Sequence, residues 1–298
     1  MKKALLYGVL ASFFFAFTFV LNRSMNLSGG YWLWSACLRY LFMLPMLAVI
    51  LWRNHAFKDM FQAIKKDIIS WLLWSTIGFG LFYLPLSLAS IYGESWLVAS
   101  SWQITIVAGI LLTPLFGEKI PKKNLSISCI ILIGVFMLQM TNMEKLETNK
   151  VIITLLPIIL AAFAYPLGNR KMMKICPSFI TTIQRVFGMT LCSMPFWIVA
   201  SLFAFVKVGM PSGMQVTQSI LVALFSGVIA TILFFKATDL VKSNPKQLAL
   251  IEATQSGEVF FSLLGGIAIL GDPMPSMLGI VGICFIIAGM IYNSLITS

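Results

Sequence analysis

Long apolar runs separated by short polar breaks limit most strongly what this chain can fold into. A helix needs about 20 apolar residues to cross the hydrocarbon core of a bilayer. Only 10% of the 298 residues are charged and 59% are hydrophobic, whereas a soluble domain carries about a quarter charged residues. The sequence therefore predicts an all-α integral membrane protein with ten transmembrane helices. The expected spans lie at about 4–21, 31–52, 68–90, 95–116, 124–141, 151–168, 178–205, 217–240, 246–270 and 276–296.

The basic residues predict the orientation of these helices. With a cytoplasmic N-terminus, 14 of the 21 Lys and Arg residues fall on the inner side and three fall within spans. The four on the outer side are Arg23, Lys145, Lys150 and Lys207. Cytoplasmic loops of membrane proteins carry this excess of positive charge. We therefore expect a multi-pass protein of the cell (cytoplasmic) membrane with both termini in the cytoplasm. The net charge of +11 reflects this topology, so the lipid bilayer is an expected partner and nucleic acid is not.

The two halves of the chain share short motifs in the same order, at offsets of about 146 to 155 residues. An odd number of helices in each half means that the second half enters the membrane from the opposite side. The pattern predicts an inverted repeat, with five helices in 1–142 and five in 151–298, together forming one membrane domain. The matched motifs are FVLNR with PLGNR (Phe19–Arg23 and Pro166–Arg170), LRYLFM with QRVFGM (Arg39 and Arg185), GEKIP with GDPMP (Gly117–Pro121 and Gly271–Pro275), and ILIGV with IIAGM (Ile131–Val135 and Ile286–Met290).

These motifs carry a family resemblance. The 5+5 layout, the NR ending of the first helix of each half and the G-[ED]-x-x-P ending of the fourth resemble the drug/metabolite transporter superfamily, EamA-like ten-helix type. The stretches FTFVLNRSMNLSGG and SSWQITIVAGILL are most similar to its multidrug resistance efflux transporter branch. The resemblance implies secondary transport, usually export, from a central cavity lined by both halves. Small four-helix relatives use a glutamate in their first helix, and Ala11–Val20 contains none, so that coupling mechanism does not carry over.

Glu258 is the candidate for proton coupling. It follows Pro245 by 13 residues, which places it about 20 Å along the ninth helix and near the membrane midplane. No basic residue is expected at this depth. Removal from water disfavours an ionised carboxyl group, so we expect Glu258 to alternate between a proton and a cationic substrate. The alternative is a protonated hydrogen-bond partner of a neighbouring helix, and Glu252 is the second coupling candidate.

A layer of charged side chains is expected near the inner mouth. Lys236, Arg185 and Glu252 fall at similar depth, about 10 Å from the cytoplasmic side for Glu252. They form either a structural ion pair or a gate, with Lys236 reaching toward the headgroups in the first case. Arg39, the repeat partner of Arg185, is expected below the outer face, where Glu94 is its candidate carboxylate partner.

Substrate-binding residues are expected at the same depth as Glu258. Gln255 shares a helix face with Glu252 and Glu258, and the repeat-related helix carries SSWQ. Aromatic walls with one acid suit a lipophilic organic cation, although most aromatic side chains in membrane helices serve packing. The candidates are Ser101, Trp102, Gln103, Gln255, Tyr83 and Asn22, and Asn22 has the alternative role of a cap at the outer surface.

The sequence does not contain the residue patterns that other classes of function require. The sequence shows no His/Asp/Glu cluster, no metal-like cysteine spacing and no nucleotide-binding glycine loop, so we expect no enzyme, no metal and no cofactor. The expected function is a secondary active transporter, a proton-coupled antiporter that exports small organic or cationic compounds. The alternatives are export of a metabolite (an amino acid, purine or sugar derivative) and a lipid-carrier flippase. Gly134, Gly279 and Gly282 are expected to pack helices closely, within a monomer or in a homodimer.

Overall fold

The computed structural model describes residues 1–53, 57–117, 119–143, 148–241, 247, 251 and 254–297. Every regular element in this part of the chain is a helix, so the predicted all-α class is confirmed. The elements of the first half are α1 (Lys2–Leu27), α2 (Trp32–Arg53), α3 (Phe57–Lys66), α4 (Ile68–Ser75), η1 (Thr76–Gly80), α5 (Leu81–Ala89), α6 (Ser95–Trp102), α7 (Ile104–Leu111), η2 (Thr113–Phe116) and α8 (Lys122–Met143). Those of the second half are α9 (Thr148–Ile175), α10 (Thr182–Val208), α11 (Gly213–Val222), η3 (Ala223–Ala230), α12 (Thr231–Asp239), α14 (Ser256–Gly265), η4 (Gly266–Leu270) and α15 (Met277–Thr297).

Length and composition support a multi-pass membrane protein. Within the described residues, five helical segments are long and apolar enough to cross a bilayer, and four shorter apolar segments accompany them. The number of ten spans stays a prediction. The long segments are Lys2–Leu27, Trp32–Trp52, Ile68–Ala89, Thr182–Val208 and Gly213–Asp239, and the shorter ones are Ser95–Leu111, Leu125–Met140, Ser256–Leu270 and Met277–Tyr292.

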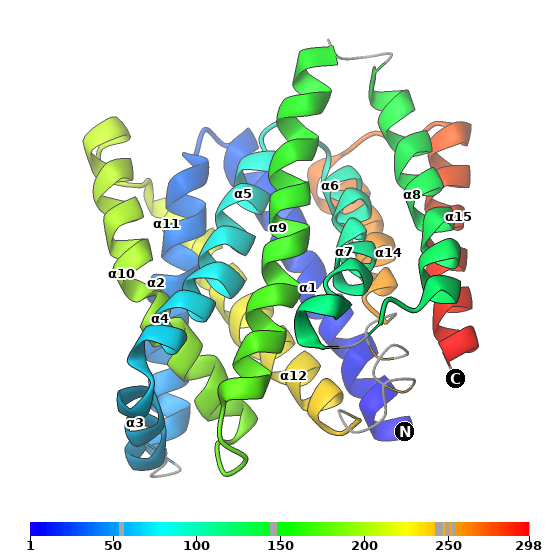
Figure 1. Ribbon diagram of the computed structural model, residues 1–298. Coiled ribbons are helices and arrows are strands. Elements are labelled where there is room, and N and C mark those ends of the chain that lie inside the picture. The colour runs from blue at the N-terminus through cyan, green and yellow to red at the C-terminus, as the bar shows by residue number, and fades with distance from the viewer. Residues whose placement is uncertain are drawn as a thin grey trace.

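The helices of the two halves interleave in a regular way. α8 packs against α15 and α2 against α10, and Figure 1 shows the first of these pairs side by side. α1 packs against η3, α12 and α14, while α9 packs against η1, α5 and α7. These are the pairings that result when each first-half helix changes places with the second-half helix that shares its motif. Both chain termini lie toward the same end of the bundle (Figure 1).

Glycines allow two of these helix pairs to approach closely. A Cβ atom on Gly134 of α8 would lie 2.6 Å from the backbone carbonyl oxygen of Gly282 on α15. A Cβ atom on Gly168 of α9 would overlap the backbone of Gly78 in η1. Small residues permit this backbone contact between membrane helices. Gly134 and Gly282 therefore pack helices of one chain together, and Gly279 lies beside Leu138 of the same pair.

Two expected helices, 95–116 and 246–270, are interrupted near their middle. The backbone N–H of Gln103 bonds to the carbonyl of Ser100 instead of Ala99, and its side-chain Nε2 donates to Ala99 O at 3.1 Å. The side chain thus replaces the missing backbone donor. Gln255 sits at the corresponding place before α14 with φ −65° and ψ −17°, close to the −63° and −10° of Gln103. Sequence hydropathy missed both interruptions because each one leaves the apolar run unbroken.

Candidate functional site

Arg39 on α2 is buried, with 3% of its surface exposed. Its Nη1 donates to Thr18 Oγ1 on α1 at 2.9 Å, and the Thr18 hydroxyl in turn bonds to Ser226 in η3. Its guanidinium carbon lies 4.1 Å from the centre of the Tyr83 ring. Nε is buried without a hydrogen-bond partner, and no described carboxylate forms an ion pair with the group. The site therefore holds a cation whose nearest partners are a hydroxyl and an aromatic face.

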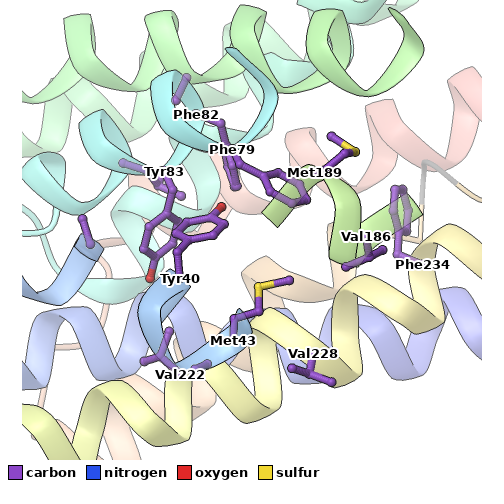
Figure 2. Packing of buried hydrophobic residues seen from close by; sticks show 14 of the residues in the cluster. Tyr40, Met43, Phe79, Phe82, Tyr83, Val186, Met189, Val222, Val228 and Phe234 are labelled. Carbon is purple, nitrogen blue, oxygen red and sulfur yellow. The ribbon is translucent and has the colours of Figure 1, made fainter. Parts of the chain in front are cut away.

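Tyr83 connects this cation to α1. Asn22 Nδ2 donates to Tyr83 Oη at 3.1 Å, and Ser87 Oγ lies 3.5 Å from the same amide nitrogen. Asn22 is 1% exposed and Tyr83 is fully buried. The described contacts thus make Asn22 a buried contact between helices, and they do not support a cap at the outer surface. Figure 2 shows Tyr83 beside Tyr40, whose ring centre is 5.7 Å away.

A group of aromatic rings continues from Tyr83 toward the second half. Phe82 lies 5.1 Å from Trp102 and 4.7 Å from Tyr165, measured between ring centres. Trp102 and Tyr165 are 5.6 Å apart in an edge-to-face arrangement. Sequence reasoning missed Tyr165 on α9, although it is the repeat counterpart of Thr18 at the 147-residue offset of the NR motif. That offset is the signal that could have found it.

Glu258 lies in the first turn of α14 and is 2% exposed. Arg39 is the charged group that acts on its carboxyl electrostatically. The expectation that no basic residue lies at the depth of Glu258 stays a prediction, because the described contacts include no hydrogen bond or ion pair between Arg39 and Glu258. Tyr165 lies within electrostatic range of Glu258 and within hydrogen-bonding reach of Gln255.

The SSWQ stretch divides between two environments. Trp102 joins the aromatic rings, whereas Ser101 accepts a hydrogen bond at 2.7 Å from Gln139 Nε2 on α8. The side-chain oxygens of Gln103 and Gln139 are buried without a partner in the described part of the chain. Successive residues of a helix point about 100° apart, so Ser101 and Trp102 cannot face the same neighbour. Gln139 was absent from the sequence-based candidates.

We call the group that joins both halves the central cluster, in which Tyr165 is half-buried and the other members are buried. It consists of Thr18, Asn22, Arg39, Tyr83, Trp102, Tyr165, Gln255 and Glu258. Groups of three or more His, Cys, Asp or Glu residues that could hold a metal ion are absent from the described residues. The cluster thus offers one carboxyl group, one guanidinium cation, hydroxyl and amide groups and aromatic faces. This combination suits reversible binding of an organic molecule.

Comparison with known proteins identifies the family. Residues 2–298 match the family described as "Putative multidrug resistance efflux transporter". The chain belongs to this family. It is 47% identical over 305 residues to the "Uncharacterized protein YjlA" of Bacillus subtilis (strain 168), with 98% of this chain and 94% of that protein covered.

Two further proteins are similar to this chain over most of its length. The "Uncharacterized 42.1 kDa protein in intracellular alkaline protease 3'region" of Shouchella clausii is 45% identical over 266 residues, which cover 86% of this chain and 70% of that protein. A solved structure, described only as a crystal structure of a protein, has a TM-score of 0.69 at 13% identity and covers 100% of this chain and 98% of its own. This last match shows the fold alone.

In this member of the multidrug resistance efflux transporter family, Arg185 of the charged layer expected near the inner mouth has a partner outside that layer. Arg185 on α10 forms an ion pair with Asp239 of α12, with 3.2 Å between Nη1 and Oδ1, and Thr182 Oγ1 donates to the same carboxylate. Lys236 is exposed and has no ion pair with a described carboxylate. Glu252 lies outside the described residues. Glu94, the expected partner of Arg39, is instead the residue before α6 and is only partly buried.

Proposed function

We propose that the protein is a secondary active transporter that exports small organic compounds across the cytoplasmic membrane in exchange for protons. The observation that supports this most directly is the burial of Glu258 beside a helix interruption. Intramembrane ionisable residues commonly mark substrate and proton pathways. Family membership supports small-molecule efflux as the setting for this chemistry.

Glu258 carries the proton in this proposal. Its carboxyl group releases a proton when the cationic group of a substrate arrives, and it takes up another proton before the empty transporter returns. Tyr165 and Gln255 provide hydroxyl and amide groups beside it, and Trp102 with Phe82 provides an apolar wall. Asn22 and Tyr83 line the Arg39 side of the same cluster. Ser101 and Gln103 support the wall from α6 and its C-terminal end.

The scaffold consists of two inverted five-helix repeats, 1–142 and 151–298, with both termini in the cytoplasm. Three observations support this division: the exchangeable helix pairs, the matched interruptions at Gln103 and Gln255, and the excess of basic residues on one side. Interrupted helices from both repeats commonly form the transport site of such proteins. Arg185 and Asp239 link α10 to α12 as the inner gate, with Lys236 nearby and Arg39 at the related position of the first repeat.

The test is transport by purified protein in proteoliposomes with an imposed pH gradient and labelled tetraphenylphosphonium as substrate. Glu258→Gln keeps the size of a protonated glutamate but cannot exchange a proton, so gradient-driven transport should be lost while the protein stays folded. Glu94→Gln removes an acid outside the central cluster and should keep the gradient dependence. Unchanged pH dependence in Glu258→Gln would contradict the role of Glu258 and make Glu252 the next residue to test. Gradient-driven uptake of amino acids, purines or sugars without tetraphenylphosphonium transport would keep proton coupling and favour a metabolite exporter, whereas uptake of lipid carriers would favour the flippase.

A further inference from the structure

The two repeat-related arginines have different partners. Arg185 has a carboxylate from its own chain, because Asp239 accepts hydrogen bonds from Nη1 and Nη2 at 3.2 and 3.3 Å. Arg39 has the equivalent position, a hydroxyl partner in Thr18 and an aromatic face in Tyr83. Among the described residues, no carboxylate forms an ion pair with Arg39. The chain thus completes one of these arginine sites with an anion and leaves the other without one.

The unsatisfied side of Arg39 has the geometry of an anion site. Its hydrogen bonds within the described residues are limited to the one from Nη1 to Thr18, and Nε is buried without a partner. The Nε and Nη2 groups of a guanidinium form a planar fork that binds a carboxylate through two parallel hydrogen bonds. A buried donor without a partner is costly for the folded protein. An oxyanion at this fork would satisfy both the donors and the charge.

Glu258 cannot serve as this anion throughout a transport cycle. No ion pair joins it to Arg39 in the described part of the chain. When Glu258 takes up a proton or binds a substrate cation, its negative charge no longer balances Arg39. A substrate with only a cationic group would then leave a net positive charge in the buried cluster. A substrate that also brings an anionic group would keep the cluster neutral.

We propose that the central cluster takes organic molecules with both a cationic and an anionic group on an apolar or aromatic body, the anionic group binding Arg39 and the cationic group binding Glu258. This inference rests on the proposed function and names the substrate class of the same site. The rings of Phe82, Trp102 and Tyr165 belong to the same cluster and contact one another, so they would contact the body of the molecule. Both charged side chains are buried here, so the substrate reaches them when the transporter opens to one side.

The experiment compares matched probes that differ only in charge. The probes are 4-(aminomethyl)benzoate and phenylalanine, which differ in the spacing of their two charges, with the methyl ester and the N-acetyl derivative of each. Affinity for the full chain in lipid nanodiscs is obtained from the dependence of thermal stability on probe concentration. We expect at least one zwitterion to bind about tenfold more tightly than its own ester, as one charge-assisted hydrogen-bond pair allows. The N-acetyl derivative should also bind more weakly, because it lacks the cationic group.

Variants assign the preference to one arginine. Arg39→Gln should reduce the affinity for the zwitterion to that for its ester, and Arg39→Lys should retain part of the difference because it keeps the charge without the fork. Arg185→Gln is the matched control, since it removes the repeat-related arginine and should leave the ratio of the two affinities unchanged. If Arg39→Gln does not fold, the ratio of zwitterion to ester affinity in Arg39→Lys is compared with that in the natural sequence. An unchanged ratio would contradict the inference.

Several outcomes would overturn the inference. These are equal affinity for zwitterion and ester in the natural sequence, a preference that persists when Arg39 is replaced, a preference lost equally in Arg185→Gln, or no binding of either zwitterion. A different measurement, gradient-driven transport, tests the proposed function. Gradient-driven transport by Glu258→Gln would reject proton coupling, while the ratio of zwitterion to ester affinity in the natural sequence would still report on Arg39.

Discussion

Single side chains decide how charge is tolerated inside this bundle. Arg185 and Asp239 are 10% and 20% exposed as side chains and satisfy each other directly. Loss of one partner leaves an uncompensated charge away from water, which costs roughly 3 kcal/mol or more for buried pairs. We therefore expect Asp239→Asn to lower the free energy of unfolding by about 3 kcal/mol, measured by thermal unfolding in detergent. The double variant Arg185→Met with Asp239→Leu should recover part of this loss. Additive losses from the two sites would show that they are not coupled.

Elements pack in this protein through contacts that leave no room for an extra methyl group. The closest approach of α8 and α15 places the Gly282 carbonyl 2.6 Å from the position of a Cβ on Gly134, and backbone atoms of two long helices cannot move apart cheaply. Gly134→Ala should therefore destabilise the protein by roughly 1–3 kcal/mol, as overpacking does elsewhere. The measurement is thermal unfolding of the purified variant. Gly213→Ala, at the start of α11 with no atom within 4 Å of its Cβ position, is the control and should be neutral. Equal stability of the two variants would contradict close packing of α8 on α15.

The whole molecule has one orientation that its basic residues predict. In a background without native cysteines, Met210→Cys should react with a membrane-impermeant maleimide in intact cells, because Met210 is 77% exposed between α10 and α11. Gln62→Cys on α3 should react only after the membrane is permeabilised. The exposed Gln62 is a better reporter than its neighbour Ala63, which is buried. Labelling in the reverse pattern would invert the topology and place the Arg185–Asp239 pair toward the outer side.

Features that depend on local composition could be predicted from the sequence. Apolar length sets the all-helical membrane class, since a bilayer core accepts only segments whose backbone groups bond internally. The short motifs identified the family, and their spacing related Arg39 to Arg185. The burial of Glu258 also followed from its place within an apolar run, because a carboxyl group facing lipid would be costly.

The partners of these residues required the tertiary structure. Depth along a helix is a one-dimensional quantity, whereas contact depends on how each helix is rotated and how far each side chain reaches. Arg185 therefore pairs with Asp239 of α12, whereas Arg39 donates to Thr18 of α1 and lies over the ring of Tyr83. The interruptions at Gln103 and Gln255 are invisible to hydropathy because a side chain replaces a backbone hydrogen bond at Gln103 without changing the apolar run. The sequence by itself determined which residues form apolar helices, because apolar length is a local property, and the packing of these helices against one another decided which side chains meet.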